Sequence, residues 1–299
     1  MIQKKQIMEY LNKSPDYDGM RLFTTQHLEW YINTFDQFFG DEWTQPDQNN
    51  ANYILWHDGQ TFFYNLLQKE ITPRFTSLKD RRLETQMLSF SDRAMSNGMV
   101  KPLTWKGQPI MKTPSDLILY QTLLWDLKPD NVIDLGTWNG STLDYLKTIS
   151  DAYGLNTNYY SFDIMNKDSN LYADNLNIDT YKAHEELFKN LKGTTLVIED
   201  SHVNYTKVLD YLLQFLSSND YIVIEDLFNK ESDKYKTFLN WYDDRLVLDN
   251  HYIDLFGPEN TSAGVGILKK VYWKYKLRYS VSSYPYSLFH PKGVNDGAW

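Results

Sequence analysis

The sequence predicts an α/β fold in which a mostly parallel sheet is closed by an antiparallel edge pair. Between residues 113 and 271, short apolar runs alternate with helical patterns, which is typical of consecutive βα units. Before this region, aromatic residues recur at spacings of three and four, which favours amphipathic helices. We therefore expect three parts: a helical N-terminal cap (1–112), a sheet domain (113–271) and an aromatic C-terminal arm (272–299).

The two flanking parts are unusually rich in aromatic side chains. The helical spacing in the cap is carried by Trp30, Tyr31, Phe35, Phe38 and Phe39. If these side chains and those of the arm were exposed in a monomer, they would form a large apolar patch. We therefore expect the cap to roof the ligand edge of the sheet and the arm to contact a neighbouring subunit, which predicts a homo-oligomer.

The sheet domain begins with a helix that follows the capping signal Thr113-Pro114-Ser115-Asp116 and stops at Lys128-Pro129-Asp130. Short apolar runs then mark the strands. The expected strands are 131–136, 159–163, 176–180, 194–199, 221–225, 246–256 and 264–271. The expected helices between them are 142–150 and 205–217. Because a loop at 257–262 separates the last two strands, they are expected to pair antiparallel.

Composition and charge exclude several classes of protein. The 299 residues carry a formal net charge of −9, so no non-specific attraction to nucleic acid or to anionic membranes is expected. The absence of cysteine excludes disulfides, thiolate zinc sites, iron–sulfur clusters and a cysteine nucleophile. Because no stretch approaches 18 uncharged apolar residues, we expect a cytoplasmic protein that does not enter the membrane.

The most informative segment follows the strand expected at 131–136. Asp134 ends that strand, and Gly136 and Gly140 open the turn into the next helix. Glycines at such a turn let a ligand approach the backbone, and the helix N-terminus presents free N–H groups. A dinucleotide site would favour G-x-G-x-x-G. The D-x-G-x-x-x-G pattern of this chain instead resembles motif I of class I S-adenosylmethionine-dependent methyltransferases, and this resemblance implies a Rossmann-like methyltransferase sheet.

A second acid supports this resemblance. Asp163 lies 29 residues after Asp134 (163 − 134), at the end of the next expected strand. In the methyltransferases that the motif resembles, an acid at this place accepts hydrogen bonds from the ribose hydroxyls of the cofactor; the alternative is an ordinary turn carboxylate. The segment from Ala183 to Leu187 looks like the one that borders the adenine. The resemblance implies a cofactor site formed by Asp134, Gly136, Thr137, Gly140, Ser141, Asp163 and Ala183.

Four acids follow two neighbouring strands. Glu199 and Asp200 end one strand, and Glu225 and Asp226 end the next, 26 residues later (225 − 199). Parallel neighbours bring these carboxylates to one edge of the sheet, where a cation or strong hydrogen-bond donors must compensate their charge. Carboxylate oxygens suit Mg²⁺, which predicts a divalent metal site. Helix caps and surface charges are the alternative.

The pattern over residues 110–270 resembles the metal-dependent small-molecule O-methyltransferases of the catechol and caffeoyl-coenzyme-A type, and more closely the cephalosporin hydroxylase family. That family resembles D-x-D-H where this chain has Glu199-Asp200-Ser201-His202, so either Glu199 or Asp200 is the expected metal ligand. The catechol-type enzymes carry a lysine base three residues after this first acid. His202 holds that position, as a general base, a third ligand or a structural residue.

These resemblances imply a Mg²⁺-dependent transfer of a methyl group from S-adenosylmethionine to a hydroxyl of a small molecule, such as a sugar or a specialised metabolite. Two alternatives stay open. The chain could be a metal-independent N- or O-methyltransferase whose acidic edge holds a cationic amine. It could also be an inactive partner subunit that binds the cofactor only.

Overall fold

The computed structural model describes residues 2–13, 20–57, 59–60, 63, 67, 74–78, 81, 103–164, 171–172, 175–227, 232–256 and 259–271. The chain divides into two compact units, one containing the described residues up to 67 and the other those from 74 to 271. The predicted division into three parts, with boundaries at 112 and 271, stays a prediction. The predicted C-terminal arm, 272–299, lies outside the described residues.

The first unit is helical and has its own aromatic core. It contains the helices α1 (Lys4–Lys13) and α2 (Met20–Phe39). Phe35 and Phe39 are buried against Trp43 and Phe63, and the rings of Trp43 and Phe63 stack with centroids 4.7 Å apart. The same helix α2 leaves three of the predicted aromatics largely exposed: Trp30, Tyr31 and Phe38. The helical spacing is thus correct, but only part of the aromatic set faces this core.

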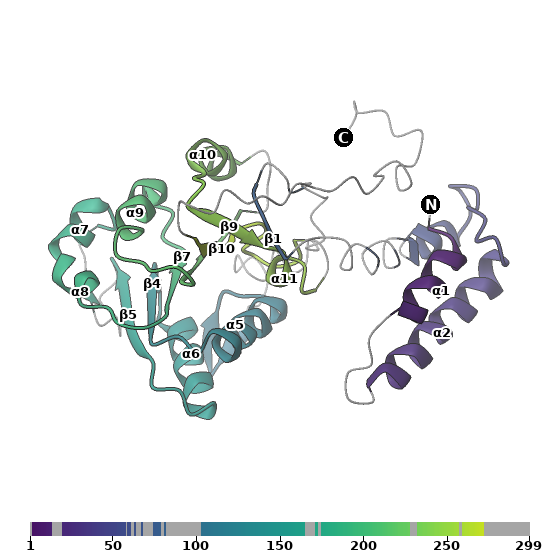
Figure 1. The fold of residues 1–299 in the computed structure, drawn as a ribbon, viewed down its shortest axis with the longest axis horizontal. Helices are drawn as coiled ribbons and strands as arrows, with labels where there is room; N and C mark the ends of the chain where they lie inside the picture. Colours follow the sequence, from purple (N-terminus) through teal and green to yellow (C-terminus); the bar gives the residue numbers. More distant parts are fainter. Residues whose placement is uncertain are drawn as a thin grey trace. The chain divides into compact units, whose positions relative to one another are not determined.

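The second unit is built on an eight-stranded sheet in the order β1-β9-β10-β8-β7-β4-β5-β6 (Figure 1). The parallel part comprises β4 (Asn131–Leu135), β5 (Asn158–Asp163), β6 (Leu171–Tyr172), β7 (Thr195–Glu199) and β8 (Tyr221–Ile224). The antiparallel part comprises β10 (Ile267–Lys270), β9 (Leu246–Asp249) and β1 (Phe75–Thr76). The predicted fold class is therefore confirmed: a mostly parallel α/β sheet with an antiparallel edge.

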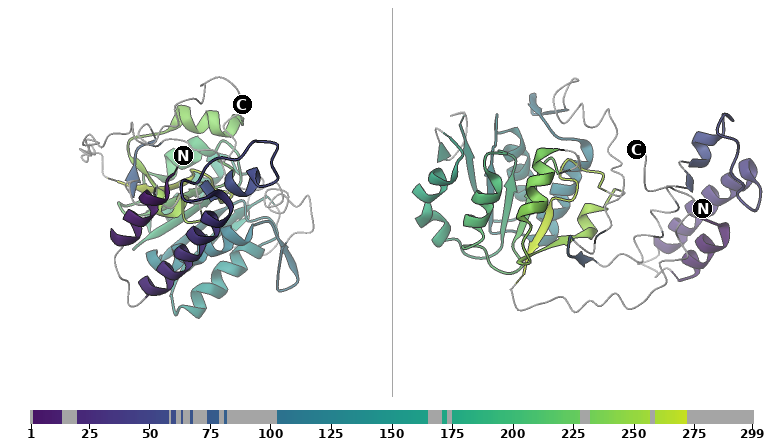
Figure 2. Two further views of the ribbon diagram at one scale, coloured as in Figure 1. Left: turned by 90° about the vertical axis from the view of Figure 1, so that its right-hand side faces the viewer. Right: turned by 90° about the horizontal axis from the view of Figure 1, so that it is seen from above.

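Helices cover both faces of this sheet. α5 (Pro114–Leu127) packs on α6 (Ser141–Ala152) along one face. The opposite face carries α9 (Tyr205–Leu212), which contacts α7 (Ile178–Ala183) and α10 (Asp233–Trp241) (Figure 1). Figure 2 (right) shows the unit from the side of α10. Two further short helices are α8 (Glu185–Lys189) and α11 (Asn250–Ile253). Because both faces are covered, β4 and β7 are buried at every position.

Three details of the prediction are wrong. The strand expected at 176–180 is absent: α7 begins at Ile178, because the Asn177 side chain accepts the Asp179 N–H at 2.9 Å and caps a helix. The strand expected at 246–256 ends at Asp249, whose carboxylate likewise caps α11. The predicted helical cap also contains strands: β1 joins the main sheet, and β2 (Leu103–Trp105) pairs with β3 (Gln108–Ile110) as a hairpin.

Among the described residues, no helix combines the length and the apolar character that crossing a lipid bilayer requires.

Candidate active site

The turn after β4 is shaped by two glycines. Gly136 has φ +94°, and a Cβ at this position would lie 2.7 Å from the backbone N of Ser201. Only glycine therefore allows the turn to approach the segment that follows β7. Gly140 has φ +80° and precedes α6 without a side-chain cap. The sequence thus forms the tight strand-to-helix turn that its glycine spacing predicts.

Two carboxylates flank this turn. Asp134 is buried, burial raises its pKa to about 6, and its Oδ2 has no hydrogen-bond partner in the described part of the chain. Asp163, at the end of β5, accepts the backbone N–H of Trp138 through Oδ2 at 2.6 Å. Asp163 therefore helps to hold Trp138 in its left-handed conformation, φ +51°.

A cavity of about 340 Å³ opens at the carboxyl ends of β4, β7 and β8. This is where ligands bind in open α/β sheets, and the volume lies within the usual range for small molecules. From the turn it is lined by Asp134, Gly136, Thr137 and Trp138. From the ends of β7 and β8 it is lined by Asp200, His202, Glu225 and Asp226. The cavity therefore joins the two sets of residues predicted from different motifs.

The predicted cofactor residues Gly140, Ser141 and Ala183 do not line this cavity. Ser141 begins α6 and is buried, and its Oγ has no hydrogen-bond partner among the residues described. Gly140 directly precedes it. Ala183 is the last residue of α7, is exposed, and is not part of the cavity wall. Trp138, which the sequence reasoning did not select, lines the cavity and is 39% exposed.

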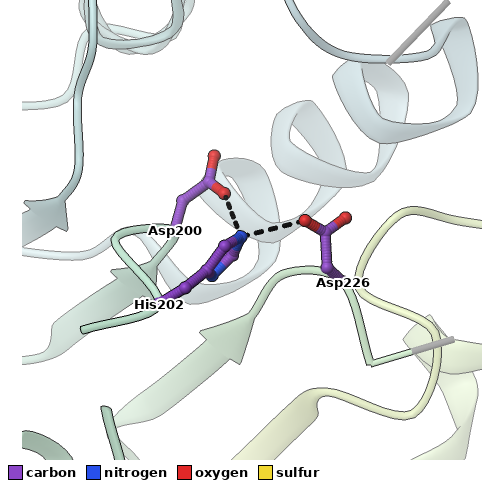
Figure 3. A group of neighbouring side chains, drawn as sticks. All are labelled: Asp200, His202 and Asp226. Atoms are coloured by element: carbon purple, nitrogen blue, oxygen red, sulfur yellow. Dashed lines mark hydrogen bonds and ion pairs between the residues drawn. The ribbon is translucent and has the colours of Figure 1, made fainter. Parts of the chain in front are cut away.

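Asp200, His202 and Asp226 form a compact group, which we call the acid–imidazole group (Figure 3). One ligand atom of each lies within 4.8 Å of those of the other two. His202 Nε2 is 2.9 Å from Asp226 Oδ2 and 3.5 Å from Asp200 Oδ1. Two carboxylates and an imidazole are a donor set that divalent cations accept. Of the two candidates left open at the end of β7, it is Asp200 that lies in this group.

Glu199 is held elsewhere. Its buried carboxylate accepts the backbone N–H of His202 at 2.7 Å and the Ser201 hydroxyl at 2.9 Å, both through Oε1. Its Oε2 lies 3.5 Å from Lys234 Nζ. Burial alone would raise the pKa of Glu199, but the bond from His202 and the charge of Lys234 outweigh it and lower this pKa. Glu199 thus supports the turn that carries His202.

Glu225 lines the cavity from a deeper position. Its Oε1 accepts the hydroxyl of Tyr120 and lies 3.5 Å from Lys112 Nζ. Burial raises the pKa of Glu225 to about 8. Its Oε2 has no hydrogen-bond partner within the described ranges, so this oxygen is available to a ligand.

Two lysines that the sequence reasoning missed compensate the acidic edge. Lys112 Nζ lies 2.8 Å from Asp200 Oδ2, with a side chain only 6% exposed. Lys234 belongs to α10. Its Nζ lies 2.6 Å from His202 Nδ1 and also donates to the backbone carbonyl of Glu225. Lys112 directly precedes the capping signal at 113–116, and this place in the sequence indicates only weakly that its side chain lies at the site. No pattern in the sequence indicates Lys234 as a site residue, because α10 is brought to the site only by the tertiary fold.

The protonation of His202 depends on all these neighbours. Burial would lower its pKa, but the carboxylates of Asp226 and Glu199 outweigh burial and raise it. The 2.6 Å contact between His202 Nδ1 and Lys234 Nζ requires one of the two nitrogens to donate and the other to accept. His202 can take up a proton at Nε2 only when that nitrogen is deprotonated, which a cation bound near Asp200 and Asp226 would favour.

Comparison with known proteins agrees with the motifs. Residues 97–241 match the family described as Rhamnosyl O-methyltransferase/CmcI. A Rhamnosyl O-methyltransferase from Mycobacterium leprae (strain TN) is 30% identical over 136 residues, which are 41% of this chain and 59% of that relative. The chain thus aligns with less than two thirds of the relative.

Solved structures of CmcI are also similar. An apo structure has a TM-score of 0.48 at 18% identity and covers 69% of this chain and 95% of its own. A structure of CmcI with Mg and SAM has a TM-score of 0.47 at 19% identity, with the same coverage.

The predicted resemblance to the cephalosporin hydroxylase family is confirmed by the family match, which contains the turn after β4 and the ends of β7 and β8. Residues 97–241 of this chain thus resemble the Rhamnosyl O-methyltransferase/CmcI family of S-adenosylmethionine-dependent methyltransferases.

Proposed function

We propose that this chain transfers a methyl group from S-adenosylmethionine to a hydroxyl of a small molecule, with the help of a divalent cation, most simply Mg²⁺. The observation that carries the proposal is that one cavity is lined both by the turn after β4 and by the acid–imidazole group. Methyl transfer requires the donor and the hydroxyl to be held together, and proximity supplies much of the acceleration.

The residues around the turn fit the cofactor. Asp134 Oδ2 and Ser141 Oγ are buried polar atoms without hydrogen-bond partners in the described residues, and such atoms cost free energy unless a ligand or water binds them. In our assignment Asp134, Gly136, Thr137, Gly140 and Ser141 contact the cofactor around the turn. Asp163 accepts from its ribose, and Ala183 borders its adenine. When bound, the cofactor supplies the methyl group.

The donor set of the acid–imidazole group fits a hard divalent cation. Asp200 and Asp226 would hold it, with Glu225 Oε2 as a further candidate oxygen and Glu199 as a support of the turn. A bound cation lowers the pKa of a coordinated hydroxyl. His202 would assist by accepting the proton of the acceptor at Nε2, with its own ring proton on Nδ1, the nitrogen that faces Lys234 Nζ.

We further propose that the acceptor is a sugar or another hydroxylated metabolite. The name of the relative from Mycobacterium leprae, Rhamnosyl O-methyltransferase, supports a sugar hydroxyl. A cavity lined by Asp200, Glu225, Lys112 and Ser262 offers many hydrogen-bond partners to a polyol, and Met111 and Trp138 add apolar contacts.

The proposal includes a homo-oligomer. Trp30, Tyr31 and Phe38 of α2 are 61%, 46% and 51% exposed, and the predicted arm adds further aromatic residues. Light scattering of the full chain should give more than one subunit, and removal of residues 272–299 should lower that number without changing cofactor affinity. Equal monomers in both cases would refute this part.

The decisive experiment measures methyl transfer to a panel of glycosides with labelled S-adenosylmethionine. Activity should disappear after chelation and return with Mg²⁺, and Asp226→Asn should abolish it. Glu186→Gln is the matched control, because Glu186 is a surface acid with an 80% exposed side chain. Full turnover after exhaustive chelation would favour the metal-independent alternative. Cofactor binding without turnover on any acceptor would favour the inactive partner subunit.

A further inference from the structure

The orientation of Asp226 is not set by its own backbone preference. Asp226 is the second residue after β8 and has φ +60°, the left-handed region that non-glycine residues seldom adopt. Such a conformation persists only where the surroundings determine it. Here the backbone N–H of Asp226 donates to the carbonyl of Ser262 at 2.7 Å. The position of Asp226 therefore depends on the loop that carries Ser262.

That loop is fixed by a single carboxylate. The N–H of Ser262 donates to Asp116 Oδ1, and its hydroxyl donates to Asp116 Oδ2, each at 2.7 Å. Asp116 is 1% exposed and Ser262 is 3% exposed. In an interior, such charge-assisted bonds are strong and directional. Ser262 is therefore held at two points.

The sequence assigns Asp116 to the capping box of α5, and the structure shows this role as well. Asp116 Oδ2 accepts the backbone N–H of Thr113 at 2.7 Å, and Thr113 Oγ1 accepts the N–H of Asp116 at 3.1 Å. A capping box needs only one of the two carboxylate oxygens. Oδ1 is used for Ser262, which lies 146 residues away in sequence. The cap therefore does not account for the second oxygen.

We propose that Asp116 is a positioning residue for the acid–imidazole group. It holds Ser262, and the carbonyl of Ser262 holds Asp226 in the conformation that faces Asp200 and His202. This inference rests on the proposed cation site. Lys112, four residues earlier, binds Asp200 directly, so one segment fixes both carboxylates of the group. Residues that orient metal ligands in this way commonly change metal affinity 10- to 100-fold when they are altered.

The test is a Mn²⁺ titration of the full chain, followed by calorimetry or electron paramagnetic resonance. Asp116→Asn should weaken Mn²⁺ binding about tenfold. Ser262→Ala, which removes only the hydroxyl, should weaken it less but measurably. S-adenosylmethionine affinity, measured in parallel, should stay within about twofold, because neither residue belongs to the turn after β4.

Thr113→Ala is the matched control. It removes the capping hydroxyl but leaves both bonds from Ser262 to Asp116, so it should lower Tm without changing the Kd for Mn²⁺. If Asp116→Asn does not fold, Ser262→Ala decides. Unchanged Mn²⁺ affinity in the folded variants would overturn this inference while leaving the cation site intact. Failure of the unaltered chain to bind either Mn²⁺ or Mg²⁺ would instead overturn the cation site, and this inference with it.

Discussion

Lys112 and Asp200 form a largely buried ion pair, with Nζ and Oδ2 2.8 Å apart. The same ammonium lies 3.5 Å from Glu225 Oε1. Four strand-end carboxylates at one edge would otherwise repel one another, and Lys112 from the start of α5 and Lys234 from α10 supply the compensating charge. The edge is therefore stable without relying on a bound cation alone.

Replacing this lysine should destabilise the chain. Lys112→Met should lower the free energy of unfolding by on the order of 3 kcal/mol, because it leaves Asp200 and the buried Glu225 without their cation. Urea unfolding measures this loss, and added Mg²⁺ should recover part of it. Lys106→Met is the control, since Lys106 pairs with Asp144 at the surface, where both side chains are about half exposed. That change should cost below about 1 kcal/mol. Equal losses in the two variants would contradict the role of Lys112.

The cofactor assignment of Asp163 makes a separate prediction. Asp163→Ala should weaken S-adenosylmethionine binding at least tenfold, or about 1.4 kcal/mol, because a charged acceptor is lost and the bond to the Trp138 N–H is lost with it. Asp163→Asn can keep an oxygen toward Trp138, so it separates the loss of charge from the loss of the turn. Asp151→Asn, at an exposed position of α6, is the control for calorimetry. Unchanged affinity in both Asp163 variants would remove the ribose assignment.

His202 should affect turnover more than binding. His202→Gln should lower kcat by about 10²- to 10⁴-fold, the usual contribution of a general base, with little change in the KM for the cofactor. Steady-state kinetics measures this split. Because the side chain of His202 is 39% exposed, the substitution should cause no large fall in Tm. A variant with normal kcat would show that His202 only supports the turn.

The sequence is sufficient to predict the sheet and the place of the site, for two physical reasons. Parallel strands that are covered on both faces must be apolar throughout, so β4, β7 and β8 appear as short apolar runs. The residues that follow such strands meet at one edge, so strand order alone predicts that Asp134, Asp200 and Asp226 lie near one another, and all three line the cavity.

Other features could not be predicted because they depend on tertiary contacts. Consecutive residues at the end of a strand point to different sides of the sheet. For this reason Asp200 lies in the acid–imidazole group, whereas Glu199 accepts the backbone N–H of His202. Lys234 is 32 residues from His202 in sequence. The two-residue strands β1 and β6 have too few residues to produce a period, and they exist only because a longer neighbour pairs with them.

Gly136 provides the sharpest test of the turn after β4. Gly136→Ala should lower the free energy of unfolding by on the order of 3 kcal/mol, combining the cost of a left-handed non-glycine residue with overpacking. The overpacking arises because the new Cβ would lie 2.7 Å from Ser201 N and 2.8 Å from Asp200 O, and backbone atoms cannot easily move aside. Since this displacement reaches both Asp200 and the turn, the affinities for Mn²⁺ and for S-adenosylmethionine should fall together.

Gly154→Ala separates the cost of a left-handed backbone conformation from the cost of overpacking. Gly154 also has a positive φ, +68°, but no atom lies within 4 Å of the place of a Cβ. It should therefore show only the conformational cost, about 1 kcal/mol, and leave both affinities unchanged. Chemical denaturation of the two variants under the same conditions gives the difference, which measures the close approach of the β4 turn to the segment after β7. If both variants lost the same free energy, the approach would contribute nothing, and Gly136 would be required for its backbone conformation alone.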